Sequence, residues 1–241
     1  MDLGLDGKVA VVAAGSRGLG LASAQALAAE GVRLVVSARG QDGLESAAAS
    51  LRSSGAEVAT LVADIGDPDA PERLVDAAVD RFGGLDIVVA NAGGPPPARS
   101  LEVTEDQLDA AFNLNLRSAI RLVRAAVPRL ADRGWGRICC ITSYSVVQPV
   151  PNLALSNTAR VGLWAWAKTA AQDLASDGSG ITLNLACPGA HATDRMKELG
   201  GSGVMGDPAD FGKVVAFLCS QPAGYINGAA IVVDGGATLA L

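Results

Sequence analysis

Short runs of β-branched and aliphatic residues alternate with alanine-rich stretches of helical period along the whole chain. The first runs are "KVAVVAA", "RLVVSA", "EVATLVA" and "LDIVVANAG", and the helical stretches that follow them cover 18–30, 41–54, 69–82 and 104–131. The pattern continues with "GRICCITS", a helix over 152–177, "ITLNLACPG", a helix near 207–220 and "AAIVVDGG". Repeated strand–helix–strand units predict an α/β fold, a doubly wound parallel sheet of seven strands with helices on both faces.

The composition agrees with a sheet that is buried on both faces. Hydrophobic residues make up 49% of the chain and aromatic residues only 4%, so Ala, Val, Leu and Ile must build the interior. The 241 residues contain no Pro- or Ser-rich linker, repeat or charge block. We therefore expect a single domain over 1–241.

Charge and hydropathy exclude several classes of protein. A net charge of -6 and a pI near 4.8 argue against a nucleic-acid partner, which needs clustered Lys and Arg. No apolar run reaches about 18 residues, and "MDLGLDGK" has acids where a signal peptide has a basic start, so we expect a cytoplasmic protein without a membrane partner. The four cysteines lack metal-ligand spacing and disulfide density, which predicts buried free thiols and no metal site.

The segment "AAGSRGLG" falls between the first strand and the first helix. Its glycines permit a tight turn and let backbone amides and a helix N-terminus approach a pyrophosphate. The alternative is a tight turn without a ligand, but the flanking strand and helix supply the context that the motif needs. The predicted phosphate-binding residues are Ala14, Ser16, Arg17, Gly18, Leu19 and Gly20.

Further motifs follow in a characteristic order: "ADI", "NAGG", the Asn of "FNLNLRS", "ITS", "CPG" and "VVDGG". In order and spacing they resemble the short-chain dehydrogenase/reductase family over nearly the whole chain. The resemblance implies a Rossmann-like fold, a nicotinamide dinucleotide and a small-molecule substrate. The family usually begins its glycine loop with Thr-Gly, where this chain has Ala13 and Ala14.

The resemblance also assigns cofactor contacts at the carboxyl ends of the strands. Two alternatives stay open: Asp64 could cap the next helix, and Asn91 could serve only its own turn. The implied contacts are Asp64 and Ile65 at the adenine, Asn91, Ala92 and Gly93 as support from the fourth strand, and Pro188, Gly189 and Thr193 in the loop that binds the nicotinamide carboxamide.

Charge at the end of the second strand predicts which nicotinamide cofactor binds. An acid there would bind the ribose 2′-OH, whereas a 2′-phosphate needs Arg. The chain has Ser37 and Ala38 followed by Arg39, and Arg17 lies in the glycine loop. Solvated surface arginines are the alternative, but two cations at one crevice favour NADP(H) over NAD(H).

In the family, a Ser after the fifth strand polarises the substrate oxygen, a Tyr thirteen positions later transfers its proton, and a Lys four further on lowers the pKa of that Tyr. Ser143 fits the first role, and Asn115 fits the Asn that anchors a relay water. Ser156 and Arg160 stand at the Tyr and Lys positions. A serine does not titrate in an accessible range, and Arg160 can bind the ribose but cannot relay a proton. This Ser-x-x-x-Arg pattern resembles a sub-branch that is otherwise similar to 3-oxoacyl-(acyl-carrier-protein) reductases.

Two other residues could supply the proton. Tyr144 follows Ser143, but neighbours on a strand face opposite sides, so we expect Tyr144 to pack away from the substrate. The lone His191 lies in the loop after "CPG", where a functional role and a plain loop position are equally open.

Two functions are therefore consistent with the sequence. The favoured one is an NADP(H)-dependent carbonyl reductase or alcohol dehydrogenase, with an apolar pocket from "GGPPPARS" and 146–155 and a short lid over 193–207. The alternative is a nucleotide-holding sensor or partner subunit that has lost turnover. In either case the apolar surfaces of the helices over 104–131 and 152–177, including Trp164 and Trp166, predict a homodimer or homotetramer.

Overall fold

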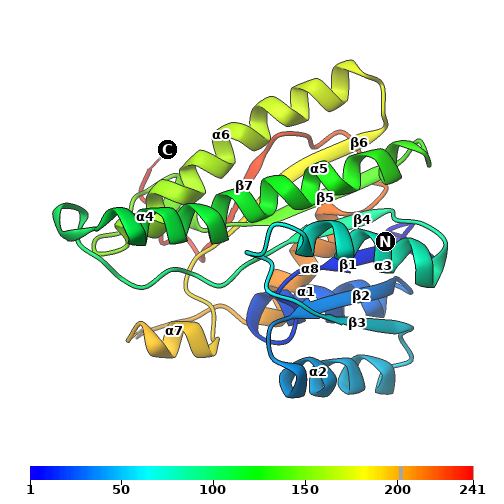
Figure 1. Ribbon diagram of the computed structural model, residues 1–241, viewed down its shortest axis with the longest axis horizontal. Helices are drawn as coiled ribbons and strands as arrows, with labels where there is room; N and C mark the ends of the chain where they lie inside the picture. Colours follow the sequence, from blue (N-terminus) through cyan, green and yellow to red (C-terminus); the bar gives the residue numbers. More distant parts are fainter. Residues whose placement is uncertain (201–202, 241) are drawn as a thin grey trace.

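Seven parallel strands form one sheet in the computed structural model, which describes residues 1–200 and 203–240 (Figure 1). The strand order is β3-β2-β1-β4-β5-β6-β7, and every neighbouring pair is parallel. This confirms the predicted doubly wound α/β fold. The strands are β1 Val9–Val12, β2 Arg33–Ala38, β3 Val58–Val62, β4 Ile87–Ala90, β5 Gly136–Ile141, β6 Ile181–Pro188 and β7 Ala230–Val233.

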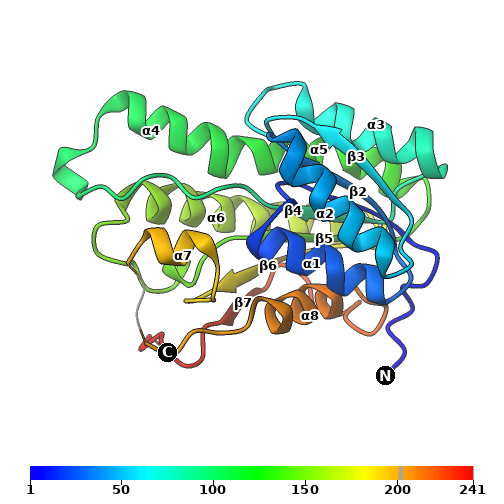
Figure 2. The same cartoon turned by 90° about the horizontal axis from the view of Figure 1, so that it is seen from below.

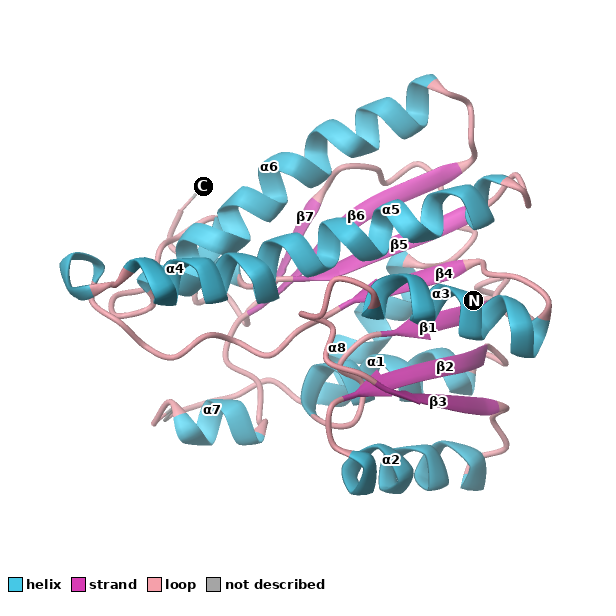
Figure 3. Cartoon of the chain, viewed as in Figure 1, coloured by secondary structure: helices cyan, strands magenta, loops and turns pink. Residues whose placement is uncertain are grey.

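Helices cover both faces of the sheet (Figures 1 and 2). One face packs against α1 Gly18–Ala29, α2 Gln41–Ser53 and α8 Pro208–Leu218. The other packs against α3 Ala70–Phe82, α5 Ser118–Ala131 and α6 Ala154–Ser176, with α4 Glu105–Phe112 ahead of α5. A short helix, α7 Asp194–Glu198, lies away from both layers (Figure 3).

Each strand sends side chains into two separate cores. In β1, Val9 and Val11 join the core under α3, α5 and α6, whereas Ala10 and Val12 join the core under α1, α2 and α8. Successive residues of a strand face opposite sides, so burial on both faces requires an uninterrupted apolar run. This is why "VAVV" shows no alternation between apolar and polar residues.

The helix expected over 104–131 is present, but it contains a π-helical turn that the sequence did not predict. Helix α4 begins with a capping box, in which the Gln107 backbone N–H donates to Thr104 Oγ1 (3.3 Å) and the Thr104 N–H donates to Gln107 Oε1 (3.1 Å). A π-helical turn, Asn113–Arg117, then separates α4 from α5. Two asparagines of this turn bond to strand-end loops, Asn113 to Gly66 O (2.9 Å) and Asn115 to Gly93 O (2.8 Å). These bonds favour the wider turn, a feature that is common at functional sites.

All four cysteines are buried free thiols, as predicted. Burial is the first cause that raises the pKa of Cys140 and Cys187, the latter to about 11, and a hydrogen bond with Cys219 is the first cause for Cys139. No helix of the described residues is both long and apolar enough to cross a membrane.

Candidate active site

A crevice of about 1160 Å³ opens where the strands end. The loops after β1, β2, β3, β4, β5 and β6 all contribute to its wall, together with the start of α6 and with α7. In a parallel sheet these ends meet at one edge, which is where ligands bind in doubly wound folds. Of the sequence-predicted site residues, all line this crevice except Gly20 and Asn115.

The glycine loop presents an open helix N-terminus to the crevice. Arg17 is the N-cap of α1 and makes no capping bond with its side chain, and the first turn holds no acid. The first backbone N–H groups of a helix are without partners inside it, so this end suits an anion. Gly18 has φ +58, a conformation that favours glycine. A Cβ on Gly18 would lie 3.7 Å from Thr193 Cγ2, so this glycine lies next to Thr193.

Ala14 stands in the left-handed region with φ +48. The loop is held there from β4, because Asn91 Nδ2 donates to Ala14 O at 3.2 Å. A Cβ on Gly20 would meet the same Ala14 oxygen and Asn91 Nδ2, so only glycine lets the loop lie this close to α1. Asn91 therefore does more than serve its own turn: it ties β4 to the glycine loop.

The two predicted phosphate-binding arginines, Arg17 and Arg39, both line the crevice and are exposed. The sequence placed Asp64 at the adenine but did not predict its ion pair with Arg39, in which Arg39 Nη1 lies 3.8 Å from Asp64 Oδ2. This ion pair is largely exposed and is worth little, about 0–1 kcal/mol. A phosphate could therefore replace Asp64 as the partner of Arg39 at small cost.

Asp64 does not cap the next helix. Its Oδ1 accepts from the Gly66 N–H at 2.9 Å in the loop after β3, and the N-cap of α3 is Asp69. Ile65 is buried beside it, and both residues line the crevice. Ala92 and Gly93 follow Asn91 along the same wall.

The loop after β6 forms the opposite wall. Pro188 ends β6, and Gly189 has no room for a side chain because a Cβ would lie 2.6 Å from Asp234 Cβ. Thr193 caps α7, accepting from the Met196 N–H at 3.3 Å. Sequence reasoning missed α7 and its Arg195, whose Nη2 donates to Pro95 O (2.5 Å) and so joins this wall to the loop after β4. The lid over 193–207 includes residues 201 and 202, which lie outside the described residues.

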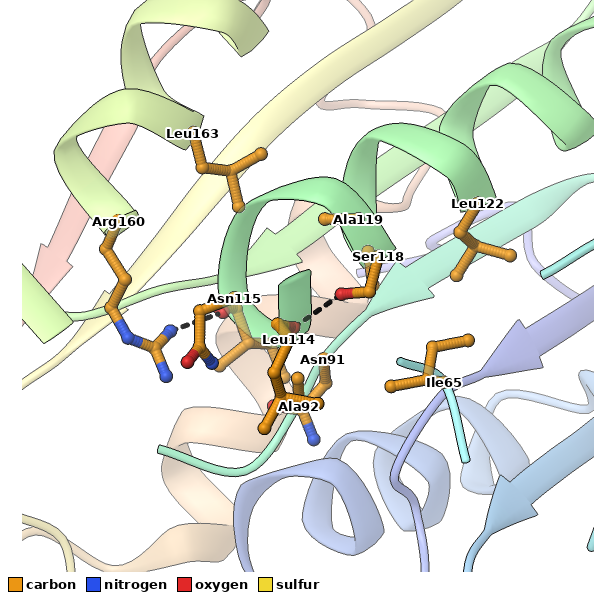
Figure 4. Close-up of a pocket in the computed structure, with 12 residues that line it drawn as sticks. Ile65, Asn91, Ala92, Leu114, Asn115, Ser118, Ala119, Leu122, Arg160 and Leu163 are labelled. Atoms are coloured by element: carbon orange, nitrogen blue, oxygen red, sulfur yellow. Dashed lines mark hydrogen bonds between the residues drawn. The ribbon is translucent and has the colours of Figure 1, made fainter. Parts of the chain in front are cut away.

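Asn115 borders a small cavity behind the crevice, shown in Figure 4. The cavity measures about 10 Å³, room for roughly one water molecule. Asn115 Oδ1 is buried and has no hydrogen-bond partner in the described part of the chain. Arg160 points toward Asn115 from α6 (Figure 4). The position of Asn115 fits a residue that orders water next to the site.

Arg160 is held by two partners. Its Nε donates to Ser156 Oγ at 3.2 Å, and its Nη1 donates to Ile141 O, the last carbonyl of β5, at 3.1 Å. The residue is 8% exposed, and burial lowers the pKa of its guanidinium to about 10, with smaller effects from Cys187, which raises it, and Arg195, which lowers it. Arg160 therefore stays charged at neutral pH and fixes Ser156 relative to the end of β5.

Ser143 and Tyr144 both line the crevice, so the expectation that Tyr144 packs away from it is wrong. Strand β5 ends at Ile141, and Tyr144 begins a 3₁₀ turn, Tyr144–Val146. The alternation of a strand therefore no longer applies at these two residues. Ser143 Oγ accepts from the Ser145 N–H at 3.1 Å.

His191 lines the crevice but is packed as a structural residue. Its ring lies edge-on to Phe211 at 5.2 Å between centroids, and Nδ1 lies 3.2 Å from Gly189 O. The backbone of Gly206 forms an isolated β-bridge with the backbone of His191. Gly206 also leaves space for the imidazole ring, because a Cβ on Gly206 would lie 2.9 Å from His191 Cδ2. These contacts favour the plain loop role over proton transfer. Within 1–200 and 203–240, no three His, Cys, Asp or Glu gather as metal ligands.

The sequence is similar to several known proteins. The family model described as enoyl-(acyl carrier protein) reductase matches residues 13–238. "Dehydrogenase/reductase SDR family member 4" of Sus scrofa is 34% identical over 246 residues, covering 96% of this chain and 88% of that protein. "Versicolorin reductase stcU" of Emericella nidulans is 34% identical over 258 residues, covering 97% of this chain and 96% of that protein.

The fold is similar to solved structures with bound nicotinamide cofactors. L-sorbose reductase from Gluconobacter frateurii, complexed with NADPH and L-sorbose, has a TM-score of 0.92 and 31% identity, with 100% of both chains covered. A 7α-hydroxysteroid dehydrogenase complexed with NADH has a TM-score of 0.92 and 27% identity, covering 98% of this chain and 96% of that one.

Proposed function

Because this chain belongs to the short-chain dehydrogenase/reductase family, we propose that it is an NADP(H)-dependent oxidoreductase acting on the carbonyl or alcohol group of a small molecule. One observation carries the proposal. A single crevice holds the open start of α1, the two arginines Arg17 and Arg39, and the hydroxyls of Ser143 and Ser156. Its volume of about 1160 Å³ has room for a dinucleotide beside a small substrate. We propose that residues 1–241 work as one nucleotide-binding domain.

The cofactor roles follow the walls of the crevice. Ser16, Gly18, Leu19 and the first amides of α1 would hold the pyrophosphate, Arg17 and Arg39 the 2′-phosphate, and Asp64 and Ile65 the adenine. Gly20 would act indirectly, by letting the loop lie close to α1. Asn91, Ala92 and Gly93 would support the loop at Ala14 from the end of β4, and Pro188, Gly189 and Thr193 would hold the carboxamide. When bound, the nicotinamide supplies or accepts a hydride. Arg160 would bind the ribose of the nicotinamide.

The substrate oxygen lies against Ser143 and Ser156. Ser143 polarises the oxygen, and Asn115 orders water behind it. Ser156 orients the oxygen, and a water delivers the proton because Arg160 stays protonated and cannot relay one. The wall near the substrate includes Pro95, Val150, Leu153, Met196 and Leu199, so an apolar substrate fits it.

A nucleotide-binding sensor or partner subunit without turnover is the second candidate. One observation favours it: no Tyr or Lys stands on α6 at the crevice, where Ser156 and Arg160 are found. Such a protein would bind NADPH but not oxidise it with any carbonyl substrate.

The test is a fluorescence titration with NADPH and NADH, followed by NADPH oxidation with a panel of activated ketones, quinones and acyl thioesters. We expect tighter binding of NADPH, and Arg39→Asp should reverse the preference because it removes a cation and adds a repelling charge. Arg99→Asp, an exposed arginine outside the crevice, is the matched control. Equal affinities of the unmutated protein for both cofactors would contradict the NADP(H) assignment.

For assembly, we propose a homodimer or homotetramer through α4, α5 and α6. Trp164 and Trp166 are only partly buried in the single chain, and Val161 on the same helix is exposed. Light scattering at micromolar concentration tests this, and a monomer would mean that both tryptophans only complete the core.

A further inference from the structure

The hydroxyl of Ser156 differs from the other hydroxyls on its helix. Thr158 and Thr169 donate to the carbonyl four residues earlier, Ala154 O (2.8 Å) and Ala165 O (3.3 Å). Ser156 makes no such bond within the described residues, and Arg160 Nε–H donates to its oxygen. A guanidinium can only donate, so Ser156 Oγ is the acceptor in that pair. The hydroxyl proton of Ser156 is therefore free for a partner in the crevice.

Ser143 is arranged in the same way from the other side. Its oxygen accepts from the Ser145 N–H, and its own proton has no acceptor among the described residues. Arg160 links the two serines, since Nη1 bonds to Ile141 O two residues before Ser143 while Nε bonds to Ser156. Arg160 Nη2 donates to no described residue and is not enclosed, so positive charge also faces the crevice.

We propose that Ser143 and Ser156 form a two-hydroxyl oxyanion site and that Arg160 is the positioning residue that makes Ser156 a donor. The proposal rests on the proposed function and names its substrate class. Each of these hydroxyls already accepts one hydrogen bond and keeps its own proton free, so both can donate to a developing negative charge. Preorganised donors of this kind are usually the largest single contribution to catalysis. Neither serine titrates at working pH, so the site stabilises an oxyanion without protonating it.

This restricts the substrate. Hydride addition to a simple ketone leaves an alkoxide about as basic as hydroxide. Hydride addition to a conjugated carbonyl leaves an enolate or phenolate, and phenols titrate near ~10. The alkoxide is far more basic than the phenolate, and this difference decides between the two classes of substrate because neither serine protonates the oxygen. The substrate class is a carbonyl conjugated with a carbon–carbon double bond, as in an unsaturated ketone or a quinone.

The electrons balance without a protein acid. The substrate carbon at the far end of the conjugated system gains a C–H bond from the hydride of NADPH. The two electrons of the carbon–carbon π bond shift toward the carbonyl carbon, and the carbonyl π pair ends on oxygen, between Ser143 and Ser156. The anion takes a proton from water, so the sum is substrate, NADPH and one proton giving reduced substrate and NADP⁺.

Binding of 4-nitrophenol, whose phenolate absorbs visible light, tests the oxyanion site without any turnover. Absorbance is followed against pH with and without protein, in the presence and absence of NADP⁺. We expect the phenolate to bind roughly tenfold more tightly than the phenol, which lowers the apparent pKa of the bound dye by about one unit. Ser156→Ala should remove about tenfold of this preference, and Arg160→Gln should do the same although Ser156 is still present.

Thr158→Ala is the matched control, because it removes an exposed hydroxyl from the same helix. Melting by circular dichroism checks that each variant folds, and if Arg160→Gln unfolds, Ser156→Ala still decides the question. An unchanged dye pKa in Ser156→Ala, or no saturable binding of either form, would overturn the proposal. The NADPH titration tests the proposed function independently of the dye. If NADPH binds but the pKa of the dye does not shift, only the oxyanion site is refuted. If the pKa of the dye shifts but NADPH does not bind, only the proposed function is refuted.

Discussion

Ala14 has a backbone conformation that is unfavourable for a residue with a Cβ atom. With φ +48 it occupies a region that costs an L-residue roughly 1–2 kcal/mol. The bond from Asn91 and the close approach of Gly20 hold it there. The strain lies in the loop between β1 and α1, which lines the crevice.

We expect Ala14→Gly to raise the free energy of unfolding by up to about 1 kcal/mol, because relief of strain exceeds the extra chain entropy of glycine. Urea unfolding measures this, and NADPH affinity should not fall. Ala13→Gly is the control: Ala13 is fully buried and lacks a positive φ, so its loss of a methyl group should destabilise the protein. A loss of stability in Ala14→Gly would show that the loop is not strained.

The pair on α6 gives a second prediction at this scale. Ser156→Tyr together with Arg160→Lys places a titratable phenol and an ammonium one helical turn apart, on one face of α6. Reduction of simple ketones should rise, toward the lower part of the ~10²–10⁴-fold range for general acid catalysis, because the pocket is built around serine. The readout is kcat for an unconjugated ketone, with Ser156→Tyr alone as the comparison.

Another outcome of these measurements would assign the proton donor to a different residue. If the double variant stays inert while Tyr144→Phe abolishes a measurable native activity, the proton comes from Tyr144, which lines the same crevice. His191→Ala tests the remaining titratable ring, and we expect it to lower stability more than kcat because the ring packs on Phe211.

At the scale of elements, α1 and α8 lie in contact because of one glycine. A Cβ on Gly212 of α8 would run into the backbone carbonyl of Ala22 on α1. Gly212→Ala should therefore lower the free energy of unfolding by about 1–3 kcal/mol, the usual cost of overpacking.

Gly43 of α2 provides the matched control for this substitution. A Cβ there would meet nothing within 4 Å, so Gly43→Ala should stabilise α2 by about 0.5–1 kcal/mol. Thermal melts of both variants give the comparison. Equal and small shifts would mean that the α1–α8 contact relaxes without cost.

The strands and most helices could be predicted because local pattern determines them. Uninterrupted apolar runs such as "VAVV" require burial on both faces, and glycine-rich turns follow them. The helix over 104–131 was predicted, but its π-helical turn was not, because that turn depends on bonds from Asn113 and Asn115 to Gly66 and Gly93, which are distant in sequence. The helical periodicity of a sequence does not indicate which distant residues its side chains will bond to.

The candidate site was predictable as a set of segments but not as a set of contacts. Loops at strand ends meet at one edge for topological reasons, so the residues of the crevice were found. The Arg39–Asp64 pair, the bond of Arg160 to Ile141 O and the turn of Tyr144 into the crevice are long-range or depend on where β5 stops.

For the whole molecule, the buried thiols predict how stability depends on pH. Cys139, Cys140 and Cys187 have raised pKa values, so the folded chain keeps their protons while the unfolded chain releases them near the ordinary value of 9. Their contribution is full below pH 9 and is lost as pH rises, by about 1.4 kcal/mol per pH unit for each thiol. Above pH 10 the lowered pKa of Arg160 acts in the opposite direction, because the folded state then loses its proton first.

The clearest window is therefore pH 9 to 10. The urea midpoint of the unmutated protein, measured under reducing conditions, should fall from pH 8 to pH 9 and again to pH 10. The difference in urea midpoint between the unmutated protein and Cys140→Ala should become smaller as pH rises, because the variant lacks one of these thiols. Parallel curves for the two proteins would contradict this origin of the alkaline loss.

The strand order has a consequence for how the chain is made. Starting from β1, each new strand joins an open edge: β2 and β3 extend one side, and β4, β5, β6 and β7 extend the other. A polypeptide emerging from the ribosome can therefore pair its strands in the order of synthesis and never has to insert one between two already paired. The free edge of β1 stays uncovered until residue 87 begins β4, so this interval of translation exposes the nascent chain to mispairing with a neighbour.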